Sequence, residues 1–386
     1  MTDNWIRIAL CLLAILVLGR VVQRANAEGS ATSVDWLVTR DGDRRGLIAS
    51  TRLPATGPAW QLWANGRGRP PLQTLDRLCP VEAENGGLAL NGGFWDEYHH
   101  PVGVCSGERG IHGSRPHRWG LALSEDRVWI GPLRPQIRLS SVGSPESLLS
   151  GLALNPQPLP EGSVYLIDPR SYPHPIEVAT DVRVAWFECR TTESLRFNTQ
   201  VGVRLERFTK TCEHRLGNKD ISGSAQVLMI LPEAAFRRLE PVLKVGSEYL
   251  IQLELGPLEE PVQLSTCGGP MLLEAGEVCA GLDEAGLETA RAARTVAACD
   301  RAGRRLWLAA FWLDANGRWG LTLEQAAREM QKLGAYHALN LDGGRSTSVW
   351  SASATPVWGW IFPMGRAIHH GLYLPGPVDI RSPRRP

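Results

Sequence analysis

Short apolar runs separated by turn residues dominate this chain of 386 residues, and such runs predict many short β-strands. The 40 glycines and 27 prolines are scattered between the runs as turn residues. Two pairs of runs predict hairpins, formed by residues 119–123 with 128–130 and by residues 295–299 with 306–312. Further strands are expected at residues 163–167, 226–231, 249–255 and 337–341.

Helical spacing of apolar residues is found in few places. The best segment runs from Leu323 to Leu333, where Leu323, Ala326, Ala327, Met330 and Leu333 share one face. Thr322 and Gln325 have the spacing of a capping box, and Gly334 is placed to end the helix. A shorter helix is expected from Pro232 to before Pro241. We therefore expect one α+β domain with a large mixed β-sheet and a few packed helices.

The N-terminus differs from the rest of the chain. Residues 8–19 are an apolar run, and Ala25-Asn26-Ala27 follows it, which is the arrangement of a secretory signal peptide. Twelve apolar residues are short for a membrane span, so we expect cleavage after Ala27 and a secreted or periplasmic protein. The alternative is a membrane anchor formed by residues 8–22. The expected organisation is a signal peptide (1–27), N-terminal strands (28–84), one domain (85–376) and a flexible tail (377–386).

Charge and cysteine content exclude several classes of protein. Without residues 1–27 the chain has 38 basic and 39 acidic residues, so no basic surplus is available for nucleic acid. Membrane contact is expected only through an uncleaved N-terminal segment. No Cys-x-x-Cys pair is present, which argues against a zinc ribbon and against a thioredoxin-like redox motif. Seven cysteines remain after cleavage, and their pairing cannot be deduced from the sequence: Cys79, Cys105, Cys189, Cys212, Cys267, Cys279 and Cys299.

Three glycine-rich segments lie at the ends of predicted strands. They are Asn91–Asp96 (NGGFWD), Cys267–Leu272 (CGGPML) and Leu339–Thr347 (LNLDGGRST). Paired glycines at a strand end allow left-handed backbone and close approach of a ligand, although each segment alone is also typical of a simple turn. None of the three is a dinucleotide fingerprint or a P-loop.

The order of these motifs resembles the phosphodiester glycosidase family. The matching segments are Asn91–Asp96, Gly268–Leu272, Arg294-Thr295, Gly320–Ala327 and Ala338–Thr347, and weaker likeness extends from about residue 85 to Leu374. The resemblance implies hydrolysis of the glycosidic bond of a sugar 1-phosphodiester or a related envelope saccharide. The chain departs from the family where Trp95 replaces a second Phe, Arg345 replaces a third Gly, and Phe311-Trp312 stands where Asp-Gly is often found.

The chemistry of that reaction suggests roles for three residues. Phosphate is a good leaving group, so one carboxylate can suffice, and we assign it to Asp342. Arg294, which matches the family motif, is the expected phosphate clamp because its fork donates two parallel hydrogen bonds. Asn91 is expected to orient water or a sugar hydroxyl. The remaining residues expected to bind substrate are Gly92, Gly93, Gly268, Gly269, Thr295, Gly343, Gly344, Ser346 and Thr347.

Alternatives to these roles remain. Asp342 also suits a simple Asp-Gly turn, Arg294 also suits the surface of a strand edge, and Arg345 is a second phosphate candidate. Trp95 and Trp350 lie nearest the motifs as possible stacking partners for a sugar. The histidines are interpreted mostly as surface residues, and no cofactor is expected, although a divalent cation at Asp342 is conceivable. A non-catalytic saccharide- or envelope-binding protein is the rival function, and the sequence does not specify the sugar, the anomer or the oligomeric state.

Overall fold

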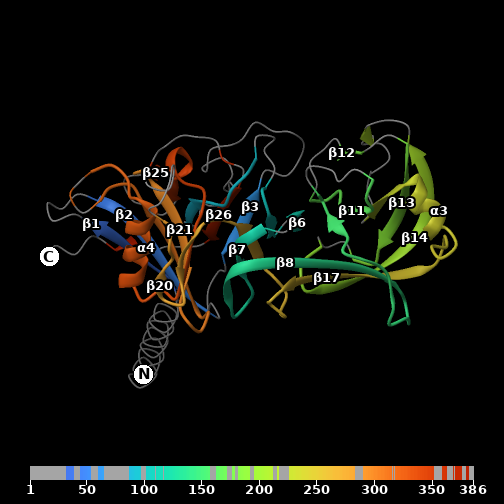
Figure 1. The fold of residues 1–386 in the computed structure, drawn as a ribbon, viewed down its shortest axis with the longest axis horizontal. Coiled ribbons are helices and arrows are strands. Elements are labelled where there is room, and N and C mark those ends of the chain that lie inside the picture. Colours follow the sequence, from blue (N-terminus) through green and yellow to red (C-terminus); the bar gives the residue numbers. More distant parts are fainter. Residues whose placement is uncertain are drawn as a thin grey trace, which may run out of the picture.

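The structure is a computed structural model, drawn as a ribbon in Figure 1. It describes residues 32–38, 44–53, 60–64, 87–96, 101–108, 110–115, 117–156, 162–171, 176–178, 181–191, 195–211, 215–216, 226–282, 290–314, 316, 318–351, 359–362, 368, 370–375 and 380–381. The predicted signal peptide lies outside the described residues and stays a prediction.

The expected α+β class is wrong, because strands make up 56 % of the structure and helices 8 %. The α-helices among the described residues are α3 (Glu233–Leu239) and α4 (Leu323–Lys332), both at predicted positions. In α4 the Thr322–Gln325 capping box forms as expected, and Gly334 follows with a φ of 81°. Only these two described helices are available to cover the strands, so the apolar faces of the sheets are buried largely against other sheets.

The expected single mixed sheet is replaced by four sheets that are almost entirely antiparallel. The described parallel pairs are β1 with β27 and β10 with β11. The first sheet has eight strands in the order β20 (Glu277–Val278), β19 (Met271–Glu274), β23 (His337–Asn340), β21 (Arg294–Cys299), β22 (Arg305–Phe311), β2 (Arg44–Arg52), β1 (Thr32–Val38) and β27 (Ile380–Arg381). The predicted hairpin of residues 295–299 and 306–312 is β21–β22.

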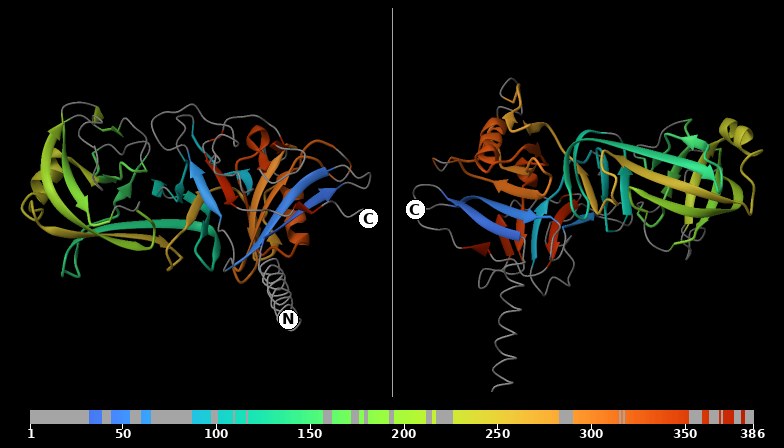
Figure 2. Two further views of the ribbon diagram at one scale, coloured as in Figure 1. Left: turned by 180° about the vertical axis from the view of Figure 1, so that it is seen from behind. Right: turned by 90° about the horizontal axis from the view of Figure 1, so that it is seen from below.

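The second sheet has twelve described strands and curls into a nearly closed barrel. Its order is β10 (Ala153–Leu154), β11 (Tyr165–Ile167), β16 (Gln226–Pro232), β13 (Val182–Cys189), β14 (Thr199–Thr211), β17 (Glu248–Gly256), β8 (Val128–Ser141), β7 (His117–Leu123), β18 (Leu264–Cys267), β5 (Val104–Gly107) and β6 (Gly110–Ser114), with β9 (Ser147–Ser150) beside β8. The long strands β8 and β17 extend along the molecule in Figures 1 and 2.

Two smaller sheets complete the described fold. A five-stranded sheet has the order β25 (Gly359–Phe362), β24 (Val349–Ser351), β4 (Gly87–Asn91), β26 (His370–Pro375) and β3 (Gln61–Ala64). A two-stranded sheet pairs β12 (Ile176–Glu177) with β15 (Arg215–Leu216). The end of β4 carries the first glycine-rich segment, and the residues after β23 carry the third.

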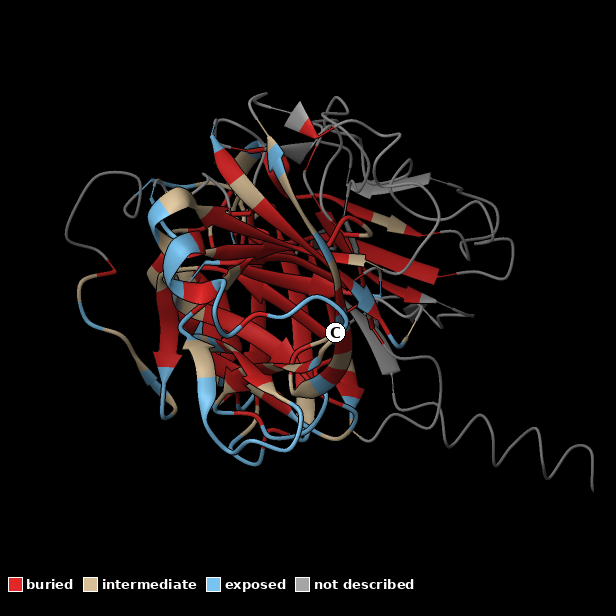
Figure 3. Cartoon of the chain, turned by 90° about the vertical axis from the view of Figure 1, so that its right-hand side faces the viewer, coloured by how far each residue is buried: buried red, intermediate tan, exposed pale blue. Residues whose placement is uncertain are grey.

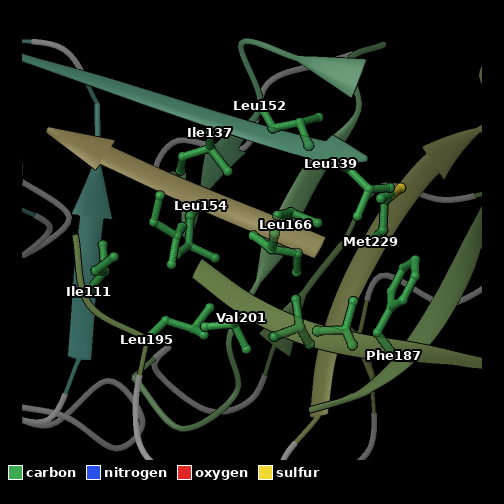
Figure 4. Close-up of a cluster of buried hydrophobic side chains, with 14 of the residues drawn as sticks. Ile111, Ile137, Leu139, Leu152, Leu154, Leu166, Phe187, Leu195, Val201 and Met229 are labelled. Carbon is green, nitrogen blue, oxygen red and sulfur yellow. The ribbon is translucent and has the colours of Figure 1, made fainter. Parts of the chain in front are cut away.

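The core follows from alternating burial along the strands. In β17 the inward positions Tyr249, Ile251, Leu253 and Leu255 are buried, whereas the residues between them are partly exposed. These side chains join the cluster that fills the barrel, which Figure 4 shows with Ile111, Ile137, Leu154, Phe187 and Met229 among its members. A second cluster lies where strands of the eight-stranded, five-stranded and barrel sheets meet, and a third lies under α4. Figure 3 shows that buried residues follow the strands, while many turns are exposed.

Side-chain hydrogen bonds close the barrel between its edge strands β6 and β10. The Ser114 hydroxyl accepts a bond from Leu154 N at 2.7 Å and donates one to Leu154 O at 2.8 Å. The Asn155 amide donates to Ile111 O at 2.6 Å, from a residue with a left-handed φ of 50°. These side chains satisfy edge-strand backbone groups that would otherwise be buried without partners.

Neither a disulfide nor a membrane-spanning helix is found in the described part of the chain. Cys105, Cys189, Cys267, Cys279 and Cys299 are all unpaired, while Cys79 and Cys212 lie outside the described residues. Burial raises the pKa of Cys267 to about 11 and that of Cys299 to about 12, so these thiols stay protonated and unreactive near neutral pH. No described helix has the length and hydropathy to cross a bilayer.

The closure of the barrel predicts a specific cost for losing one hydroxyl. Ser114→Ala removes the hydroxyl that bonds the buried backbone N–H and C=O of Leu154. We therefore expect the unfolding free energy to fall by about 1–3 kcal/mol. Urea denaturation measures the change. The control is Ser150→Ala, which removes an exposed hydroxyl from β9 and should change stability by no more than about 0.5 kcal/mol. Equal effects of the two substitutions would contradict this account of barrel closure.

Candidate functional site

The three sequence motifs meet at the end of the eight-stranded sheet, and the buried amide of Asn91 joins the first and the third of them to Thr295. Its Nδ2 donates to Asp342 O at 2.6 Å and, more weakly, to Gly92 O at 3.4 Å. Its Oδ1 accepts from Thr295 Oγ1 at 2.7 Å and from Ser348 N at 3.1 Å. Asn91 is 1 % exposed and all four hydrogen-bonding positions of its amide are engaged. The side chain is therefore occupied in holding the site together.

The Asp342 carboxylate is held by donors on both of its oxygens. Trp95 Nε1 donates to Oδ2 at 3.2 Å, and Gly343 N donates to Oδ1 at 2.9 Å. The backbone N–H of Asp342 donates to Gly92 O at 3.2 Å, which ties the Asp342 loop to the first glycine-rich segment. The residue is half-buried, so its carboxylate is oriented while part of the residue remains accessible.

Buried hydroxyl groups lie around this loop. Thr295 Oγ1 also lies 3.4 Å from Thr347 Oγ1, and Ser348 Oγ donates to Ser346 O. Ser346 Oγ and Asn340 Oδ1 are both buried and have no hydrogen-bond partner in the described structure. These two polar atoms belong to residues on either side of Asp342 in the sequence. Unsatisfied buried polar atoms in a native protein call for a partner such as water or a ligand.

Arg294 lies beside the site, but its guanidinium donates hydrogen bonds to backbone carbonyls of the protein. It is 8 % exposed, Nε donates to Leu321 O at 3.1 Å, and Nη2 donates to Ala290 O at 2.6 Å. Burial lowers the pKa of this guanidinium. At least these two donors bind loop carbonyls, so a bidentate phosphate clamp would require Arg294 to release them.

The paired glycines are places where protein backbone packs closely. A Cβ on Gly93 would lie 1.8 Å from Cys267 O, and one on Gly268 would lie 2.6 Å from Asn340 O. Gly269 N donates to Asn340 O at 2.7 Å, which joins the second and third motifs. Gly344 has a φ of 59°, the left-handed region that glycine adopts at little cost. The space beside Gly93 and Gly268 is therefore filled by backbone of neighbouring strands.

Two buried residues that the sequence analysis did not select complete the site. Gly93 N donates to His370 Nε2 at 2.9 Å and lies 3.2 Å from Thr266 Oγ1, which in turn lies 2.8 Å from His370 Nε2. His370 is 1 % exposed and His112 is 6 % exposed, so these two do not fit the interpretation of most histidines as surface residues. The buried apolar strand that follows His370 is the sequence signal that could have revealed it.

Basic residues are placed at the same end of the sheet. Arg291 forms an ion pair with the buried Asp314 at 2.6 Å, next to the Ala292–Leu321 bridge. Arg345 follows Gly344 within the third motif, is exposed, and has no ion-pair partner in the described structure. The part of the chain that the structure describes contains no group of three or more His, Cys, Asp or Glu residues placed to hold a metal ion.

A cavity of about 550 Å³ lies elsewhere, against the barrel. It is lined by β8, β14, β17 and the turn after β17, including Gln136, Gln200, Gln252 and Glu254. None of the sequence-predicted site residues lines it. The candidate site is therefore the surroundings of Asp342 and not this cavity.

Comparison with protein families places the matched region over the Asp342 half of the site. Residues 233–374 match the model of the phosphodiester glycosidase family. The matched segment contains Arg294, Asp342 and His370, whereas Asn91 lies before it. The resemblance predicted from the sequence motifs is thus confirmed over this part of the chain. A comparison with curated proteins finds no match.

Solved structures share the fold at low sequence identity. A hypothetical protein from Synechocystis aligns with a TM-score of 0.58 and 18 % identity over 85 % of this chain and 59 % of its own. A protein from Burkholderia pseudomallei aligns with a TM-score of 0.54 and 17 % identity over 85 % of this chain and 73 % of its own. The chain thus spans about 59 % of the length of the Synechocystis protein.

A third structure aligns more weakly. It is the catalytic domain of zebrafish N-acetylglucosamine-1-phosphodiester alpha-N-acetylglucosaminidase, auto-inhibited by its pro-peptide. The TM-score is 0.36 and the identity 15 %, over 89 % of this chain and 81 % of that one. A superposition at this level supports no detailed comparison of the two sites.

The neutral state of His370 predicts that the protein loses stability in acid. Desolvation by burial, with the nearby His112 as a second cause, lowers the pKa of His370 from 6.5 to about 3. As the pH falls below 6.5, His370 binds a proton in the unfolded chain, whereas in the folded chain it binds one only near pH 3. The contribution of this group to the unfolding free energy is therefore intact above pH 6.5 and falls by at most about 1.4 kcal/mol per pH unit below it.

Urea denaturation of the wild type and His370→Gln between pH 7.5 and 4 measures this dependence. We expect the variant to be less stable at pH 7.5 but to lose less stability on acidification. The other titratable groups are present in both proteins, so the difference between the two curves reports on residue 370. Two parallel curves would show that His370 does not resist protonation in the folded state.

Proposed function

We propose that the chain is an exported hydrolase that cleaves the glycosidic bond of a sugar 1-phosphodiester or a related envelope saccharide. Residues 233–374 carry a phosphodiester glycosidase-type domain. The observation that carries the proposal is the carboxylate of the half-buried Asp342 within that region, which accepts hydrogen bonds from Trp95 and from Gly343. Export is supported by the apolar run and the Ala25-Asn26-Ala27 sequence at the N-terminus.

One oriented carboxylate suits the departure of a phosphate group. A phosphate monoester leaves as a stabilised anion, so it needs less protonation than the alcohol released by glycosidases with two carboxylates. Asp342 then assists an attacking water or stabilises the positive charge that develops on the sugar ring. The unpartnered polar atoms of Asn340 and Ser346 offer nearby positions for water or substrate hydroxyls.

The phosphate contact is assigned to Arg345 rather than to Arg294. Arg294 already donates to two backbone carbonyls, whereas Arg345 is exposed and follows Asp342 by three residues. A guanidinium binds phosphate through two parallel hydrogen bonds. Arg345 stands where the family often has a third glycine, so this contact would distinguish the chain from its relatives.

A non-catalytic saccharide-binding protein is the second candidate function. It is favoured by the engagement of both Asn91 and Arg294 in binding backbone carbonyls, which leaves Asp342 as the one predicted catalytic residue that is only half-buried. Binding of a sugar phosphodiester without any turnover would support this alternative. No other activity is needed to explain the described site.

Asp342→Asn is expected to remove most of the activity while leaving the fold intact. The amide keeps the shape of the side chain but cannot accept a proton or carry the negative charge. We expect kcat on chromogenic sugar 1-phosphodiesters to fall about 10²- to 10⁴-fold, with a smaller change in KM. The control is Asp126→Asn, a surface carboxylate that pairs with Arg304. Turnover close to wild type in a folded Asp342→Asn protein would exclude Asp342 as the catalytic carboxylate.

Arg345→Gln is expected to weaken the binding of phosphate-bearing substrates and to leave the binding of neutral substrates unchanged. Loss of a hydrogen bond to a charged group typically costs about 1.5 kcal/mol or more, so KM for phosphodiesters should rise about 10-fold. A neutral glycoside of the same sugar should be unaffected. Arg237→Gln on α3 serves as a control for the loss of an exposed guanidinium. Equal losses on charged and neutral substrates would remove Arg345 as the phosphate contact.

A further inference from the structure

The turn of Gly92 and Gly93 has no side chains, so groups from other strands must fix its position. His370 begins β26 and Thr266 lies in β18, and both side chains are buried. Both accept a hydrogen bond from the backbone N–H of Gly93, whose nitrogen lies 2.9 Å from His370 Nε2 and 3.2 Å from Thr266 Oγ1. Gly92 N also donates to His370 O at 3.0 Å. The turn is therefore fixed from the five-stranded sheet and from the barrel sheet together.

The hydrogen bonds require one particular state of the His370 ring. Gly93 N–H donates to Nε2, so Nε2 must carry no proton and the ring proton is on Nδ1. Burial keeps the ring in that neutral state, because the pKa is lowered to about 3. The titratable neighbour that also lowers this pKa is His112 of β6. His370 thus acts as a neutral hydrogen-bond acceptor at neutral pH.

The same turn also sets the position of Asp342. Gly92 O accepts the backbone N–H of Asp342 at 3.2 Å, and the preceding residue, Asn91, donates to Asp342 O at 2.6 Å. Two residues after Gly93, the Trp95 indole donates to the Asp342 carboxylate at 3.2 Å. A shift of the Gly93 peptide would move both the loop that carries Asp342 and the indole that orients its carboxylate.

We propose that Thr266 and His370 are positioning residues that hold the Gly92–Gly93 turn, and through it Asp342 and Trp95, in the geometry of the reaction. Neither side chain reaches the substrate in this scheme. The proposal rests on the proposed function for its kinetic consequence. Its structural consequence, the placement of the Trp95 indole against Asp342, does not depend on any activity.

Thr266→Val tests the proposal with little change in volume. It removes the hydroxyl that bonds Gly93 N and His370 Nε2, so we expect kcat to fall about 10- to 100-fold and KM to stay within about 3-fold, because displacement of a catalytic group costs rate. Thr266→Ser retains the hydroxyl and should restore kcat to within about 3-fold of the wild type. The comparison is made on the chromogenic phosphodiester at a temperature where all variants are folded.

The matched control is Ser265→Ala, one residue earlier in the same strand. Ser265 is also buried, but its hydroxyl bonds Ser106 Oγ at 2.7 Å and does not reach the turn. We expect Ser265→Ala to lower the stability of the protein, as Thr266→Val does, and to leave kcat unchanged. If Ser265→Ala lowers kcat as much as Thr266→Val, the effect is general loss of stability and the proposal is wrong.

A second measurement separates this proposal from the proposed function. In protein labelled with ¹⁵N-tryptophan, the Trp95 indole N–H resonance is assigned by its loss in Trp95→Phe. We expect the resonance to shift in Thr266→Val and to stay in place in Thr266→Ser and Ser265→Ala. If the wild type hydrolyses no phosphodiester but these shifts occur, the proposed function fails and the positioning stands. An unshifted indole resonance in Thr266→Val would overturn the positioning role whatever the activity.

Discussion

The buried amide of Asn91 is the interaction on which the arrangement of the site depends. It lies at the end of β4, receives a hydrogen bond from Thr295 of β21, and donates one to the backbone of Asp342 after β23. Two sheets are thereby joined by one side chain whose four hydrogen-bonding positions are all used. A buried polar network of this kind stabilises only when it is complete, because a single missing partner leaves a desolvated group behind. Substitutions in this network therefore act through the geometry of the whole site.

The sequence predicts this convergence well and the fold around it less well. Asn91, Thr295 and Asp342 could be grouped from their motifs because each motif ends or begins a recognisable strand. Helix α4 and its capping box could be predicted because the signals lie within a few residues of one another. The α+β class was wrong because local patterns indicate strands but not which sheet they enter. Closure of the barrel by Ser114 depends on a strand 40 residues away along the chain.

The roles of individual side chains were harder to predict than their location. Arg294 has the chemistry of a phosphate clamp, yet the structure directs its guanidinium at two backbone carbonyls. His370 looks like one of a pair of loop histidines, yet it is a buried acceptor. In both cases the decisive partner is a backbone group supplied by a distant segment. Side-chain type limits the possible bonds, but only the tertiary fold determines which of them is made.

A site built in this way suits a reaction that needs little proton transfer. Most of its polar groups are neutral and serve to fix backbone, as Asn91, Thr266 and His370 do. In the proposed reaction, the charged groups assigned to the substrate are the Asp342 carboxylate and the exposed guanidinium of Arg345. A substrate with a leaving group as good as phosphate requires no second carboxylate. The rigid backbone around Asp342 instead favours electrostatic stabilisation, which depends on charges that are already oriented before the reaction begins.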